Sequence, residues 1–172
     1  MIDSLVAWFR ENQRPLPWRV SYDPYQVWIS EVMLQQTQVE TALPYYDRFM
    51  REFPEIEALA SAGEEQVLTM WAGLGYYRRA RNLMAAAREV VRKHAGKIPA
   101  DYDDLIELPG IGRYMAGAIL SIAYNKPFPV VDGNVRRVLS RVNGWTDDNP
   151  KMLWDAATRL VRDAEPRMVN QA

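Results

Sequence analysis

Two carboxylates with different sequence surroundings could divide acid and electrostatic chemistry between them. Glu31 interrupts the apolar segment VWISEVML, where partial burial would raise the pKa of its carboxyl and let it act as a general acid. The alternative places Glu31 on the water-facing side of the same helix. Asp132 precedes GNVRRVLSRV, where it could cap a helix and remain ionised beside the helix dipole. A protonated acid could donate a proton while an ionised carboxylate stabilises positive charge that develops in the same reaction.

Two glycines could supply a phosphate-binding turn. The segment LPGIGRYMAGAIL places Gly110 and Gly112 just before an apolar helical pattern that begins near Arg113. Glycine allows positive φ and close approach of the backbone to a ligand, and free amide groups at a helix N-terminus attract phosphate oxygens. An ordinary tight turn between two helices is the alternative, and PGIG alone favours that alternative.

Helical apolar spacing in almost every segment predicts an all-α fold that positions these residues. Near the N-terminus, Leu5, Trp8 and Phe9 have the i, i+3, i+4 spacing of an apolar helix face. Helix starts are expected wherever a capping side chain precedes such a pattern, which occurs at Asp23, Thr37, Asp132 and Asn149.

Composition excludes several kinds of chemistry. The 172 residues include no cysteine and one histidine, His94, which excludes disulfides, thiolate nucleophiles and metal sites built from cysteine or clustered histidine. No apolar run reaches the roughly 18 residues that cross a bilayer, and the N-terminus does not resemble a signal peptide.

The net charge of −1 does not exclude DNA binding, because a local basic stripe suffices. Between Tyr76 and Lys97 the sequence has such a stripe, which charge alone favours interpreting as a solvated helix face. Its members are Arg78, Arg79, Arg81, Arg88, Arg92, Lys93 and Lys97.

Three longer segments carry a family resemblance that extends from Leu16 to Val142. They are LPWRVSYDPYQVWISEVMLQQTQVETALPYYDRF, GLGYYRRARNL, and LPGIGRYMAGAIL followed by VVDGNVRRV. Together they resemble the helix-hairpin-helix DNA glycosylase superfamily, and most closely its MutY-type adenine DNA glycosylases. The resemblance implies two helical lobes with a cleft between them. One lobe would be 21–125, with the helix-hairpin-helix at about 101–123, and the other, incomplete, would be 1–20 plus 126–172.

The resemblance also assigns catalytic roles. It implies that Glu31 protonates the adenine and that Asp132 faces the deoxyribose C1′. Tyr114 stands where the similar endonuclease III group has a lysine that forms a Schiff base with the sugar. Tyrosine cannot form a Schiff base, so the sequence predicts a monofunctional glycosylase that leaves the strand uncut. A core tyrosine on an amphipathic helix is the alternative for Tyr114.

DNA contacts follow from the same resemblance. Chemistry on a base requires its extrusion from the duplex, and the segments LQQT and GYY would fill the gap. The candidate wedge residues are Leu34, Gln35, Gln36 and Tyr76, although the spacing of Leu34 fits a core leucine equally well. Trp18 and Arg19 would line the adenine pocket, with a buried tryptophan as the competing interpretation. Gly110, Gly112 and Arg113 would contact the DNA backbone.

The predicted function is removal of adenine mispaired with 8-oxoguanine or guanine in duplex DNA. A mismatch thymine glycosylase of the same superfamily, or a fragment that binds mismatched DNA without catalysis, are the alternatives. Most relatives continue beyond residue 172 with four cysteines for a 4Fe–4S cluster and a domain that reads 8-oxoguanine; this chain has no cysteine and no expected metal ligands. We expect a monomer without membrane contact, either in the bacterial cytoplasm, associated with the nucleoid through DNA, or in a compartment that the sequence does not identify.

Overall fold

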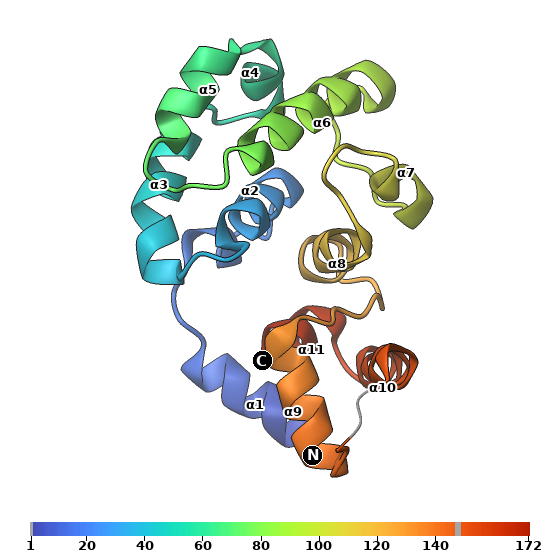
Figure 1. Ribbon diagram of the computed structural model, residues 1–172. Helices are drawn as coiled ribbons and strands as arrows, with labels where there is room; N and C mark the ends of the chain where they lie inside the picture. The colour runs from blue at the N-terminus through green and yellow to red at the C-terminus, as the bar shows by residue number, and fades with distance from the viewer. Residues whose placement is uncertain (1, 147–148) are drawn as a thin grey trace. The chain divides into compact units, whose positions relative to one another are not determined.

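The computed structural model describes residues 2–146 and 149–172, and the regular elements in these ranges are all helices (Figure 1). The all-α prediction is confirmed. The chain forms two compact units, which we name by their place in the sequence. The terminal unit combines Met1–Tyr22 with Arg113–Ala172, and the central unit is Asp23–Gly112. The predicted lobes, 21–125 and 1–20 with 126–172, stay a prediction.

The central unit is built around a long helix, α6. Its helices are α2 (Pro24–Leu34), α3 (Val39–Glu52), α4 (Ile56–Ser61), α5 (Glu64–Trp71), α6 (Arg78–His94) and α7 (Tyr102–Ile106). Helix α6 packs against α2, α4 and α5, and its course beside α4 and α5 is visible in Figure 1. In the core, the Phe49 ring centroid lies 4.9 Å from that of Phe53 and 5.9 Å from that of Trp71. Trp71 also donates from its Nε1 atom to the Gly75 carbonyl at 3.1 Å, which connects this aromatic cluster to the loop that enters α6.

The terminal unit assembles the two ends of the chain. Its elements are α1 (Ile2–Asn12), the 3₁₀ turn η1 (Pro17–Arg19), α8 (Arg113–Ala118), the π-helical turn η2 (Ile119–Ala123), α9 (Gly133–Asn143), α10 (Pro150–Arg162) and α11 (Pro166–Gln171). Helix α11 packs against α1, α10 and η2. Leu139 of α9 and Leu153 of α10 are buried in a shared apolar cluster, which fixes the direction in which α9 leaves Asp132.

Two predicted helix starts outside the site are confirmed by their hydrogen bonds. Asp23 Oδ1 accepts from the Gln26 amide at 3.0 Å, with Pro24 at the first position of α2. Asn149 Oδ1 accepts from the Lys151 amide at 2.9 Å at the start of α10. Both caps are short-range interactions, so the local sequence was sufficient to predict them.

The predicted cap at Thr37 is wrong. Helix α3 begins after Gln38, whose side chain makes no capping bond. The Thr37 hydroxyl instead donates to the Gln35 carbonyl at 3.3 Å. A threonine hydroxyl can hydrogen-bond to nearby backbone groups in a turn as well as at a helix start. In this protein the Thr37 hydroxyl makes the bond within the turn and does not cap α3.

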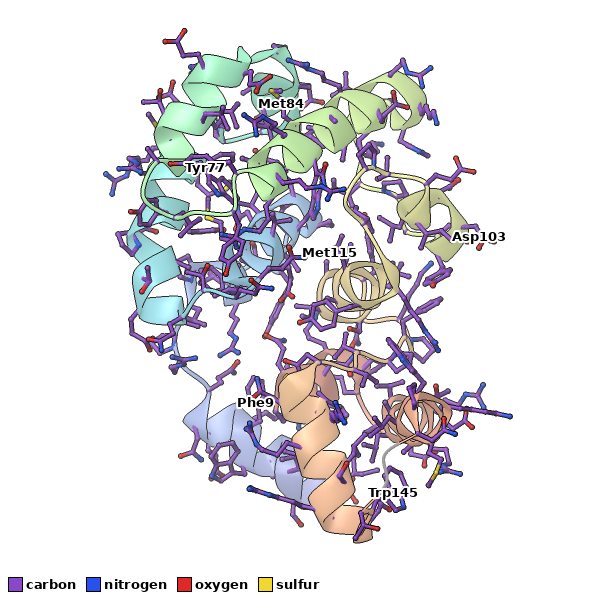
Figure 2. The ribbon with its side chains drawn as sticks, in the orientation of Figure 1. Phe9, Tyr77, Met84, Asp103, Met115 and Trp145 are labelled. Carbon is purple, nitrogen blue, oxygen red and sulfur yellow. The ribbon has the colours of Figure 1, made fainter. Side chains whose placement is uncertain are left out.

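The predicted inward face of α1 is only partly correct. Phe9, labelled on α1 in Figure 2, is buried, but Leu5 and Trp8 are 39% and 55% exposed, and Val6 is buried instead. The apolar residues of α1, from Ile2 to Phe9, surround much of the helix, and periodicity alone does not show which side its neighbours cover. None of the helices in the described ranges is long and apolar enough to span a membrane.

Candidate functional site

Asp132 is held in place by the first turn of α9. Its Oδ1 atom accepts hydrogen bonds from the amides of Asn134 at 2.9 Å and Val135 at 2.8 Å. Its Oδ2 atom accepts only a longer bond, 3.3 Å, from the Asn134 side chain. The predicted helix cap is therefore confirmed, and the carboxylate is fixed by one oxygen while the other is weakly engaged. This is a suitable arrangement for a fixed negative charge, and its catalytic role stays a prediction.

Glu31 lies on the most apolar helix of the central unit. Its neighbours Ser30 and Val32 are 1% and 6% exposed, and Glu31 itself is half-buried. The fully water-facing alternative therefore does not describe this side chain. Glu31 belongs to the central unit and Asp132 to the terminal unit, so their joint action stays a prediction.

Tyr114 is the second residue of α8. It is half-buried, and the residues that follow it, from Met115 to Ala123, are all buried (Met115 is labelled on α8 in Figure 2). Tyr114 therefore lies where an exposed helix start passes into the core of the terminal unit. The core-tyrosine alternative and the predicted role near the sugar both remain compatible with this position.

The two glycines of the hairpin differ in whether the surrounding structure requires glycine at their positions. Gly110 has φ +80°, and a Cβ atom there would lie 2.7 Å from the Asn82 Cβ of α6. Gly112 has no atom within 4 Å of such a Cβ, and it is exposed. Backbone conformation and packing thus explain Gly110, whereas nothing inside the described structure requires glycine at Gly112. A phosphate can approach a backbone amide closely only where no side chain blocks it. The open space at Gly112 meets this requirement.

Arg113 follows the hairpin and stacks on an aromatic ring. Its guanidinium carbon lies 3.6 Å from the centroid of the Trp154 ring, on α10 of the same unit. The stacking orients the guanidinium of the exposed Arg113, and the stacking partner is an aromatic ring, which does not neutralise its charge. The predicted contact with the DNA backbone is compatible with this placement and stays a prediction.

Trp18 and Arg19 lie in η1, inside the terminal unit. Trp18 is 4% exposed, in agreement with the competing interpretation of a buried tryptophan. The Arg19 Nε atom donates to Gln171 Oε1 at 2.9 Å, and its guanidinium lies 5.1 Å from the Phe9 ring centroid. Arg19 therefore joins η1 to α1 and α11, and the adenine-pocket role of both residues stays a prediction.

The predicted wedge residues lie at the end of α2 and in two loops of the central unit. Leu34 and Gln35 are half-buried at the end of α2, whereas Gln36 is exposed with φ +56°. Tyr76 is 61% exposed with φ +49°, one residue before Tyr77, which Figure 2 labels near the start of α6. Left-handed backbone is unfavourable for residues other than glycine, so surrounding contacts must hold these two side chains in position.

Arg79 contacts the backbone beside Gln36 and the residues just before Tyr76. Its Nη1 atom donates to the carbonyls of Val32 at 3.0 Å, Met33 at 2.9 Å and Gln35 at 2.6 Å. Its Nη2 atom donates to the carbonyls of Leu74 at 3.3 Å and Gly75 at 3.2 Å. One guanidinium therefore joins the end of α2 to the loop that enters α6.

Aromatic rings flank the same guanidinium. Its central carbon lies 5.5 Å from the Trp71 ring centroid and 5.3 Å from the Tyr76 ring centroid. Burial lowers the pKa of Arg79, and the interaction with Tyr76 opposes that shift. The Nε atom is buried without a hydrogen-bond acceptor in the described ranges.

The prediction that Arg79 belongs to a solvated stripe is wrong. The description fits other members of the stripe, such as Arg92, which pairs with Glu89 at the surface. Arg79 is the second residue of α6, and helical side chains lean towards the N-terminus, so this arginine reaches back over the preceding loop. That lean is the one sequence signal that could have identified it.

Comparison with known proteins places the chain in a family. Residues 29–163 match the HhH-GPD superfamily base excision DNA repair protein family. The chain belongs to this superfamily. It is similar to the adenine DNA glycosylase of Rattus norvegicus, with 46% identity over 98% of this chain and 36% of that protein. It is similar to the adenine DNA glycosylase of Buchnera aphidicola subsp. Baizongia pistaciae, with 40% identity over 98% of this chain and 49% of that protein.

Solved structures confirm the helix-hairpin-helix glycosylase fold. A thermostable thymine-DNA glycosylase superimposes with a TM-score of 0.89 and 26% identity, covering 99% of this chain and 81% of that one. A trapped endonuclease III–DNA covalent intermediate superimposes with a TM-score of 0.82 and 22% identity, covering 99% and 80% of the two chains. The predicted resemblance to MutY-type adenine DNA glycosylases is also confirmed, and this chain spans between 36% and 49% of the length of the two curated relatives named above.

Proposed function

We propose that this protein is a monofunctional DNA glycosylase that removes adenine mispaired with 8-oxoguanine or guanine and leaves an abasic site. The observation that carries the proposal is the identity of 40% to 46% with adenine DNA glycosylases across 98% of the chain. The half-buried Glu31 and the helix-capping Asp132 support it, because they are a candidate general acid and a carboxyl group held in a fixed position.

In the proposed reaction, Glu31 donates a proton to the extruded adenine, which makes the base a better leaving group. The bond between the base and C1′ then breaks, and positive charge develops on the sugar. Asp132 stabilises that charge because the amides of Asn134 and Val135 hold its carboxylate in place. The oxygen of a water molecule then bonds to C1′, and the proton that this water releases restores the carboxyl of Glu31. The products are free adenine and an abasic site in a strand that keeps its phosphodiester bonds.

Tyr114 defines the outcome of the reaction. A phenol at this position cannot attack C1′ as an amine would, so no Schiff base forms and no strand cleavage follows. Gln35, Gln36 and Tyr76 would occupy the gap left by the extruded base, with tyrosine stacking and glutamine bonding to base edges. Duplex DNA containing an adenine mispair is the proposed partner.

The 4Fe–4S cluster implied by the family resemblance does not fit the residues of this chain. Such clusters are held by cysteine thiolates, and the sequence contains no cysteine. The proposed chemistry uses only side chains and water.

A thymine glycosylase is the second candidate, because a thymine-DNA glycosylase is among the structures that superimpose well. The LQQT segment, at Leu34–Thr37, favours adenine, because it belongs to a segment that resembles MutY-type adenine DNA glycosylases. One assay separates these functions from binding without catalysis. Duplexes with adenine opposite 8-oxoguanine, adenine opposite guanine, and thymine opposite guanine are incubated with the protein and then treated with alkali.

Alkali-dependent breaks in the two adenine strands alone support the proposal. Breaks only in the thymine strand support the second candidate. Tight mismatch binding without breaks in any duplex identifies a binding protein and overturns the enzymatic proposal.

A further inference from the structure

We infer that Arg79 is a positioning residue that fixes both loops carrying the wedge residues, so that base extrusion depends on one side chain that does not itself need to touch DNA. The inference rests on the proposed function, because it assigns Gln36 and Tyr76 to the gap in the duplex. The first step is the chemistry at the end of α2. A helix leaves its last four carbonyls without amide partners, and Val32 and Met33 supply two of them.

Arg79 takes the place of the missing amides. It donates to the carbonyls of Val32 and Met33, and its charge lies at the negative end of the α2 dipole. The bond to the Gln35 carbonyl, at 2.6 Å, then holds the first residue beyond the helix. With these groups satisfied, the chain can leave the helix abruptly and place Gln36 in the left-handed region.

The second step concerns the loop before α6. The same guanidinium donates to the carbonyls of Leu74 and Gly75 and lies against the ring of Tyr76. Tyr76 is the other wedge candidate with positive φ. Arg79 therefore holds the residue before Gln36 and the residue before Tyr76, and the Trp71 Nε1 atom also donates to the Gly75 carbonyl at 3.1 Å. Backbone strain of this kind persists only where surrounding contacts impose it.

Lysine cannot reproduce this arrangement. Its ammonium is a single point with three donors, whereas the planar fork of Arg79 reaches carbonyls of two loops at once. Arg79→Lys therefore keeps the charge and removes the connection between the loops. Arg78→Lys is the matched control, because Arg78 is adjacent and exposed.

The first measurement is amide hydrogen exchange, followed by peptide, on the whole 172-residue protein. We expect Arg79→Lys to accelerate exchange by roughly tenfold in 34–37 and 74–77, while α3 to α5 exchange as in the parent protein. Arg78→Lys should match the parent everywhere. Unchanged exchange in both loops overturns the inference. Faster exchange throughout the central unit also overturns it, since Arg79 would then be a general stability residue.

The second measurement follows base extrusion with a duplex carrying 2-aminopurine in place of adenine opposite 8-oxoguanine. We expect the parent and Arg78→Lys to raise the emission. Arg79→Lys should lose most of that rise, while its affinity for matched duplex stays within about twofold, because phosphate contacts are separate from the wedge. Full emission with Arg79→Lys overturns the inference. Absence of emission with the parent overturns the proposed function instead, and the exchange experiment still decides whether Arg79 holds the loops.

Discussion

The terminal and central units hold their candidate functional groups in different ways. In the terminal unit, Asp132 binds amides two and three residues further along, all within one turn of α9. In the central unit, Arg79 holds the end of α2 from 44 to 47 residues away and joins it to a second loop. A local cap depends on little else in the protein, whereas the central arrangement makes two distant loops depend on one side chain.

The largest effect on excision is expected at Asp132, where one substitution removes the negative charge but keeps an acceptor for the helix cap. Asp132→Asn keeps an oxygen that can accept from the α9 amides but removes the negative charge. Excision should fall by about 100-fold to 1,000-fold, the range seen when one stabilising electrostatic group is lost. Single-turnover excision measures this, with Asp155→Asn on α10 as the control. If Asp132 is a cap alone, excision will stay at the parent rate.

A loss of at least about 100-fold is expected for Glu31→Gln, because the amide cannot donate the proton that a general acid supplies. Duplex binding should remain at the parent level, since the change keeps the size of the side chain. Excision and binding are compared with Glu65→Gln, an exposed glutamate on α5 of the same unit. Parent-like excision by Glu31→Gln would remove Glu31 from the mechanism.

A smaller effect is expected at the hairpin. Gly112→Ala should weaken binding to matched and mismatched duplexes alike, by roughly tenfold, because it obstructs one bond between a backbone amide and a charged phosphate. Folding should be unaffected, since the added Cβ meets nothing within 4 Å. Fluorescence anisotropy on both duplexes measures the binding.

Gly110→Ala is the informative contrast for the hairpin. Its positive φ and the approach to the Asn82 Cβ make the substitution destabilising, so its melting temperature should fall. Weaker binding to the mismatched duplex alone in Gly112→Ala would contradict a phosphate role, because phosphate contacts do not read sequence.

The smallest effect concerns the stability of the cap. Asp132→Ala should lower the free energy of unfolding by about 1 kcal/mol, the usual contribution of a helix cap, and Asp132→Asn by less. Chemical denaturation of the two variants measures the difference. Equal destabilisation by both would show that the charge, and not the hydrogen bond, is what α9 needs.

Short-range features were predicted well from the sequence. The caps at Asp23, Asp132 and Asn149 follow from a capping residue in front of a helical pattern, and the all-α class follows from apolar periodicity. The same reasoning predicted a helix cap at Thr37, and that prediction is wrong because the Thr37 hydroxyl donates to the Gln35 carbonyl instead.

Long-range features were harder to predict. The sequence shows Arg79 in a basic stripe, and its place in the first turn of α6 indicates only that the side chain leans back over the preceding loop. The sequence does not show that the end of α2 supplies three of the five carbonyls around it. The buried side of α1 was equally hard to predict, because Leu5 and Trp8 fit an apolar pattern as well as Val6 does, although only Val6 of these three is buried. The roles of Glu31, Tyr114 and the wedge residues come from family resemblance, and they stay predictions until variants are measured.

The state of the strand after adenine is removed distinguishes a monofunctional glycosylase from one that also cleaves the strand. A single-turnover reaction on adenine opposite 8-oxoguanine is divided into three parts, which are left untreated, heated in alkali, or reduced with borohydride. Because Tyr114 supplies no amine, the account predicts an intact strand without treatment, a break at the adenine position after alkali, and no covalent protein–DNA adduct with borohydride. A robust adduct would show that an amine attacks the sugar, and an intact strand after alkali would show that no adenine is removed; either result contradicts the account.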